Sequence, residues 1–144
     1  MASVARCVYF GKPDPKLEKR LHAAMVISAE YQANSKPGIT AGEMIEMAKD
    51  WFAKEGFRDD WKRHHQGGAI GYAEREWIAV PGSKEPILDH QAFAWNPIIS
   101  GTLSFDTILV YSDHIENLTR TEDWPSVRIK IDGKSYNMPD ILVR

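Results

Sequence analysis

The sequence lacks three features that would indicate particular classes of protein. It has a single cysteine, Cys7, so no internal disulfide can form. No uninterrupted apolar run approaches the roughly 18 residues of a membrane helix, and no N-terminal signal pattern is present. Neither charge dominates, because 18 Lys and Arg stand against 20 Asp and Glu. We therefore expect a soluble, cytoplasmic protein that binds neither a membrane nor nucleic acid.

The composition is typical of one folded domain. Of the 144 residues, 43% are hydrophobic and 26% are charged, which suffices for a buried core. No repeat, linker or low-complexity tract divides the chain. We expect a single domain over residues 1–144.

The first part of the chain predicts a strand and two helices. Residues 4–10 are β-prone, and Asp14-Pro15 then provides an N-cap with proline at the first helical position. Thr40 with Glu43 forms a capping box that begins a second helix. Apolar residues at helical spacing indicate a buried stripe on each helix: Leu17, Leu21, Ala24, Met25 and Tyr31, then Met44, Met47, Ala48 and Trp51.

After Gly56 the sequence consists of short apolar runs separated by Gly, Pro and polar residues. These runs predict strands at 69–72, 77–79, 91–96, 107–112, 127–131 and 134–137. Asp132-Gly133 between the last two is a strong hairpin signal, because both central turn positions favour positive φ. The order predicts an α+β fold, with helices packed on one face of a curved, mainly antiparallel sheet.

Four blocks of the sequence form an ordered pattern. They are Ser3-Val-Ala-Arg6 to Gly11, His64-His-Gln-Gly-Gly68-Ala-Ile-Gly71 followed by Arg75-Glu76, Ala94-Trp-Asn96-Pro97, and Phe105-Asp-Thr-Ile-Leu-Val110. They resemble, in the same order, Asp-x-Thr-Arg-x-x-x-x-Gly, His-x-x-Gly-His-Gly-Ile-Gly with His-Glu or Arg-Glu, Thr-Ile-Glu-Pro, and Glu-Asp-Thr-Ile-Leu-Val. These are motifs of the creatinase/prolidase/methionine-aminopeptidase family. The resemblance implies a pita-bread fold, incomplete here and matching the C-terminal part of the catalytic domain.

Members of this family use two metal ions held by two Asp, one His and two Glu. Carrying these ligands over residue by residue puts the second Asp at Ser3, the His at Gly68, and the two Glu at Asn96 and Phe105. The first Asp would precede Met1. None of the four residues present can take the ligand's role, so the resemblance implies a scaffold without a metal site and without another cofactor.

The candidate site residues that remain are His64, His65, Arg75 and Glu76. His64 matches a substrate-facing histidine of the family, or is a structural histidine bonded to backbone. His65 should point elsewhere if the segment is extended. Arg75 could bind a carboxylate through its two-pronged guanidinium, or form an ion pair with Glu74, Glu76 or Asp106.

Glu76 is a weak candidate for a catalytic base, as is His64 for an acid or base. A mononuclear metal site from His64, His65, Glu76 and His90 is a less favoured possibility, because no familiar zinc spacing is present.

We expect a non-catalytic homologue of Xaa-Pro peptidases that binds a peptide or small carboxylate. The alternative is a hydrolase, either Xaa-Pro aminopeptidase or dipeptidase-like, or a creatinase-like amidinohydrolase. Because the family's domain is longer than this chain, an exposed sheet edge should need a partner surface. That surface would be a second copy in a homodimer or larger homo-oligomer, or a missing N-terminal half.

Overall fold

The computed structural model describes residues 1–144, and it confirms the two predicted helices with their caps. Helix α1 spans Pro15–Asn34, and the Asp14 carboxylate accepts a hydrogen bond from the Lys16 backbone N–H at 2.9 Å. Helix α2 spans Ala41–Lys54. At its start the Thr40 hydroxyl accepts from the Glu43 N–H at 3.2 Å, and the Glu43 carboxylate accepts from the Thr40 N–H at 2.8 Å. These bonds satisfy N–H groups that a helix start leaves without partners.

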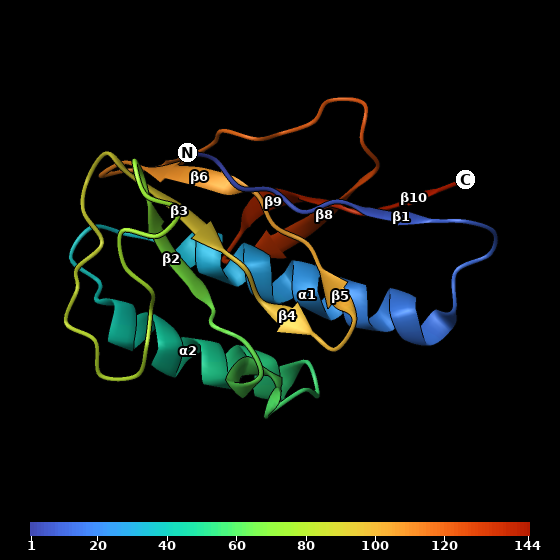
Figure 1. The fold of residues 1–144 in the computed structure, drawn as a ribbon, viewed down its shortest axis with the longest axis horizontal. Helices are drawn as coiled ribbons and strands as arrows, with labels where there is room; N and C mark the ends of the chain where they lie inside the picture. The colour runs from blue at the N-terminus through green and yellow to red at the C-terminus, as the bar shows by residue number, and fades with distance from the viewer.

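The remaining elements are short strands and one turn of 3₁₀ helix, drawn in Figure 1. They are β1 (Cys7–Tyr9), η1 (Asp60–Lys62), β2 (Gly67–Ile70), β3 (Gln91–Trp95), β4 (Ile98–Ile99), β5 (Thr102–Leu103), β6 (Thr107–Val110), β7 (Ile115–Asn117), β8 (Ser126–Ile131), β9 (Lys134–Pro139) and β10 (Ile141–Val143). Neither α1 nor α2 has the length and apolar composition needed to cross a bilayer.

The central sheet is antiparallel, with strand order β2-β3-β6-β7. Both helices lie on one side of it (Figure 1). Alternate residues of the strands face these helices and form the main core, which includes Ala69, Phe93, Trp95, Ile108 and Val110. This arrangement is the predicted α+β architecture.

The opposite face of the sheet carries a smaller apolar cluster of Ile70, Ala94 and Phe105. The first residues of the chain run across this face. The Ser3 backbone N–H donates to the Thr107 hydroxyl at 2.8 Å, and the Ala5 N–H donates to the Phe105 carbonyl at 3.1 Å. Residues 3–5 therefore help to cover the face that the helices leave open.

The β8–β9 hairpin confirms the predicted turn, since Asp132 and Gly133 have φ of 47° and 79°. The hairpin and β10 pack against α1, where Leu21, Met25 and Ala29 meet Met138 and other apolar residues. Strand β10 pairs in parallel with β1, so residues from opposite ends of the sequence lie side by side (Figure 1).

The predicted strand at 77–79 is wrong. This segment runs beside β2, with hydrogen bonds of 2.9 Å from the Glu76 N–H to the Ala69 carbonyl and from the Ala79 N–H to the Gly67 carbonyl. Two isolated bonds do not make a continuous ladder, so the segment covers the edge of the sheet without being a strand of it. The strand predicted at 69–72 is shifted to Gly67–Ile70, and Tyr72 is fully exposed.

Candidate functional site

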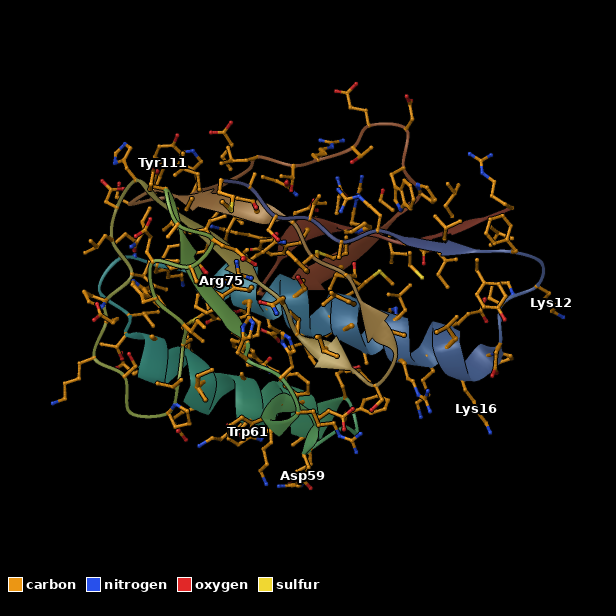
Figure 2. All side chains as sticks on the ribbon, viewed as in Figure 1. Lys12, Lys16, Asp59, Trp61, Arg75 and Tyr111 are labelled. Carbon is orange, nitrogen blue, oxygen red and sulfur yellow. The ribbon has the colours of Figure 1, made fainter.

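Four polar side chains meet at the end of the central sheet where β2 begins and β3 ends. Gly67 pairs with Trp95, so His64 and His65 before β2 lie next to Asn96 after β3. Arg75 comes from the loop after β2 and reaches back to Asn96. Figure 2 shows Arg75 over the strands, in the middle of the view, whereas the labelled Lys12, Lys16 and Asp59 lie at the periphery. We call His64, His65, Arg75 and Asn96 the His/Arg cluster.

The guanidinium of Arg75 is half-buried and has no carboxylate partner. Its Nη2 donates to Asn96 Oδ1 at 3.3 Å, and its Nη1 donates to the Glu74 carbonyl at 2.8 Å. Its Nε is buried and has no hydrogen-bond acceptor. Burial lowers the pKa of Arg75, and the nearby charge of Glu74 offsets part of this effect.

The predicted ion pair of Arg75 with Glu74, Glu76 or Asp106 is not formed. Asp106 instead pairs with Arg6 at 2.6 Å. The Glu76 carboxylate accepts a hydrogen bond from the Ala73 N–H at 2.9 Å and holds the loop that follows β2. The structure therefore gives Glu76 a contact in the loop and does not bring it to the His/Arg cluster.

The condition under which His65 would point away from His64 is not met, because the segment bends at residues 63–64 instead of extending. The centroids of the two rings are 4.2 Å apart. The His64 Nδ1 lies 2.8 Å from the His65 carbonyl and can donate to it, which leaves Nε2 of His64 free. The His65 Nδ1 accepts from the Gly67 N–H at 3.2 Å, so neutral His65 carries its hydrogen on Nε2.

Protonation of His65 is disfavoured in this position. Burial is the main cause that lowers the pKa of His65, followed by the neighbouring His64 and Arg75, while Glu74 acts in the opposite direction. The His/Arg cluster combines the Arg75 guanidinium with two imidazole rings and an amide. Two of its donors have no hydrogen-bond partner, the His65 Nε2–H and the buried Arg75 Nε–H.

The positions that the family resemblance assigns to metal ligands converge on the open face of the sheet. Gly68 pairs with Ala94, Ala94 pairs with Thr107, and the Thr107 hydroxyl bonds to Ser3. Phe105 is 5% exposed and packs against Ala94. Ser3, Gly68 and Phe105 therefore each contact β3 or β6 on this part of the sheet.

The residues at these positions do not fit a pair of metal ions. A Cβ built on Gly68 would lie 2.2 Å from the Trp77 carbonyl oxygen, so backbone occupies the space that a ligand side chain needs. The side chain of Asn96 already bonds within the His/Arg cluster, where its oxygen accepts from Arg75 and its NH2 donates to the His65 carbonyl. Phe105 offers no donor atom to a metal.

The alternative mononuclear site is not assembled either. No three His, Cys, Asp or Glu side chains come close enough to hold an ion. His90 instead contacts Asp89 at 3.1 Å and packs against Tyr111.

A cavity of about 200 Å³ lies beside the two histidines, and the sequence did not predict it. Its apolar wall is formed by Ile45 of α2, Trp61 of η1, and Ala79 and Val80 of the segment that follows β2. These residues come from three separate segments of the sequence and carry no motif. Only the packing of α2 and η1 against residues 79–80 reveals that they line one space.

Comparison with known proteins extends these observations. No protein-family model matches the chain. An Xaa-Pro dipeptidase of Pyrococcus horikoshii is 29% identical over 129 residues, which are 84% of this chain and 36% of that protein. The X-Pro aminopeptidase of Thermotoga maritima superposes with a TM-score of 0.75 at 15% identity, over 98% of this chain and 37% of its own.

A further structural match is the N-terminal domain of the FACT complex subunit SPT16 from chickpea. It has a TM-score of 0.64 and 17% identity, and the match covers 81% of this chain and 31% of that one. The chain thus spans about a third of the length of the proteins that it matches. It has part of the pita-bread fold, and its sequence resembles that of the creatinase/prolidase/methionine-aminopeptidase family.

Proposed function

We propose that this chain is a metal-free homologue of the Xaa-Pro peptidases that binds the carboxylate of a peptide or small acid without hydrolysing it. The observation that carries the proposal is the Arg75 guanidinium, which is half-buried, has an orphaned Nε–H and lacks any carboxylate partner. A buried cation without an anion is unfavourable, and a bound anion relieves this penalty.

The geometry of the donors suits a carboxylate. The free Nε–H of Arg75 and the Nε2–H of His65 belong to neighbouring side chains, and a carboxylate has two oxygens that can accept from both. The Asn96 amide holds the guanidinium through a bond of 3.3 Å and so limits its freedom. The apolar cavity beside His64 and His65 would receive a side chain of the same ligand.

The proposal of a metal-free protein rests on the close approach at Gly68 and on the apolar packing of Phe105. Without a metal-bound water, Glu76 has no nucleophile to activate, and its carboxylate is bonded in its own loop. We therefore expect ligand binding to be insensitive to chelators.

The partner that completes the fold is also part of this proposal. The relatives are about three times as long as the matched region, so either an N-terminal half or a second copy of the chain would cover the open side of the sheet. Multi-angle light scattering distinguishes these possibilities, and a monomer in isolation would argue against the homodimer. The single cysteine favours a cytoplasmic setting for this role.

Calorimetric titration with a short peptide acid and the matching C-terminal amide tests the carboxylate site. We expect the acid to bind and the amide to bind at least about tenfold more weakly, with no change on adding EDTA. Arg75→Gln should abolish this preference, and Arg75→Lys should restore it only in part because lysine lacks the planar fork. Arg58→Gln removes the same charge at an exposed position outside the cluster and should bind as the wild type does.

Equal binding of the acid and the amide would contradict the proposal. So would an Arg75→Gln variant that keeps the preference for the acid.

A second candidate function is hydrolysis, favoured by the sequence similarity to two Xaa-Pro dipeptidases from Pyrococcus species. An Xaa-Pro peptidase or a creatinase-like hydrolase would need His64, whose Nε2 is free, as its acid or base. Purified chain should be assayed with Xaa-Pro dipeptides and creatine, with manganese or cobalt and with EDTA. Turnover that His64→Ala abolishes would establish the hydrolase and displace the binding role.

A further inference from the structure

A second cavity, with a mainly polar lining, lies between β7, the β8–β9 hairpin and α1. Its volume is about 290 Å³, at the small end of the range of about 300–1,000 Å³ that is typical of small-molecule sites. Three basic side chains from separate segments line it: His114 before β7, Arg120 after β7, and Lys134 at the start of β9. The fold therefore gathers these groups from positions that are not adjacent in sequence.

The charge of this cavity is unusual for the chain. Acidic residues outnumber Lys and Arg overall, at 20 against 18, yet no Asp or Glu lines the cavity. The side chains of Arg120 and Lys134 make no hydrogen bond or ion pair in the structure. The Ser135 hydroxyl and the Asn137 amide, also in the lining, have no partner either. The cavity therefore combines free positive charge with free neutral donors.

Two of the carboxylates near the cavity are already engaged. Asp132 and Glu30 also lie near its lining, since after burial they help to raise the pKa of Tyr136. Asp113 contacts His114 at 2.7 Å at the rim, and the pKa of Asp113 is lowered chiefly by this bond. Asp106 is held by Arg6 at 2.6 Å and accepts bonds from Asn117 and Thr119. Neither Arg120 nor Lys134 forms an ion pair, although the charge of Lys134 adds a small part to the lowering of the pKa of Asp113.

From this arrangement we propose that the cavity binds the phosphate group of a small phosphomonoester. A dianionic phosphate matches two free cations, and its oxygens accept from the Arg120 guanidinium and from the Ser135 and Asn137 donors. The half-buried side chains of Ile115 and Tyr136 provide an apolar wall for the organic part. The small volume disfavours a macromolecular ligand. This site is independent of the His/Arg cluster.

Phenyl phosphate, inorganic phosphate and benzoate are suitable probes for nitrogen-15 NMR titration at physiological ionic strength. We expect phenyl phosphate to bind most tightly, inorganic phosphate more weakly, and benzoate least. The shift changes caused by phenyl phosphate should be centred on residues 114–120 and 134–137. Affinities are read from these residues, because a small carboxylate such as benzoate can also bind at the His/Arg cluster. Arg120→Gln with Lys134→Gln should weaken phenyl phosphate binding by about tenfold or more.

The matched control is Arg128→Gln with Lys130→Gln, which removes the same charge from exposed positions of β8 that do not line the cavity. The proposal is overturned if the cavity and control variants weaken binding equally, if benzoate shifts residues 114–120 and 134–137 as strongly as phenyl phosphate does, or if the shift changes spread over the whole surface.

Discussion

Replacing Gly68 with alanine tests whether this position has room for any side chain. The new Cβ would lie 2.2 Å from the carbonyl oxygen of Trp77 and 3.1 Å from the Cα of Ile78. Both contacts involve backbone atoms, which cannot rotate away as the end of a flexible side chain can. The segment 76–79 would have to move away from β2.

The magnitude follows from what this movement breaks. Overpacking of a buried position costs about 1–3 kcal/mol. The segment is tied to β2 by two hydrogen bonds of 2.9 Å, and losing one or both would add about 0.5–1.5 kcal/mol each. We expect Gly68→Ala to lower the free energy of unfolding by roughly 1.5–6 kcal/mol, which is a large share of a typical total of about 5–15 kcal/mol.

Urea unfolding followed by circular dichroism measures this change, and the midpoint should fall while the slope stays constant. Gly82→Ala is the control, because Gly82 has a φ of +75° but no atom within 4 Å of its added Cβ. The Gly82→Ala variant measures the cost of placing alanine at a positive φ without a steric clash, which is about 1–2 kcal/mol. If Gly68→Ala is no more destabilising than Gly82→Ala, the position has room for a ligand side chain, and the argument for a metal-free site loses its main support.

Two further predictions concern charge. Burial lowers the pKa of His65 in the folded state, so the unfolded chain binds a proton at His65 more readily than the folded chain does. The free energy of unfolding should therefore fall as the pH drops below the pKa of an unfolded histidine, about 6.5. Urea midpoints from pH 8 to pH 5 should show this loss in the wild type and a smaller one in His65→Gln; parallel curves would contradict it. Arg6→Gln leaves the carboxylate of Asp106, 3% exposed, without its cation and should lower the free energy of unfolding by about 3–5 kcal/mol. Lys62→Gln, which breaks an exposed pair with Asp59, should change it by less than about 1 kcal/mol, and equal effects in the two variants would refute the assignment.

The sequence predicted the elements whose signals are local. The N-caps at Asp14 and Thr40 and the Asp132-Gly133 turn each depend on a few adjacent residues, and the structure confirms all three. The short strands β4, β5, β7 and β10 were not predicted. Two to three residues carry no periodicity, and the parallel pairing of β10 with β1 depends on contacts that sequence spacing does not encode.

The candidate site shows the same limit. The resemblance pointed to His64 and Arg75, and both lie in the His/Arg cluster beside Asn96. It did not predict that His65 turns toward His64, because that depends on the bend before β2. It also did not predict the partner of Arg75, since the nearest acidic residues in sequence are engaged or directed elsewhere in the fold.

The pairing of β1 with β10 has a consequence for the order of folding. While the chain emerges from the ribosome, residues 7–9 are made well before residues 141–143. Strand β1 therefore stays without its partner strand until β10 has been made, although α1 and α2 precede β10 in the chain. Such edges are prone to pair with other chains, so chains that lack residues 141–143 should be more prone to aggregate than chains that contain them.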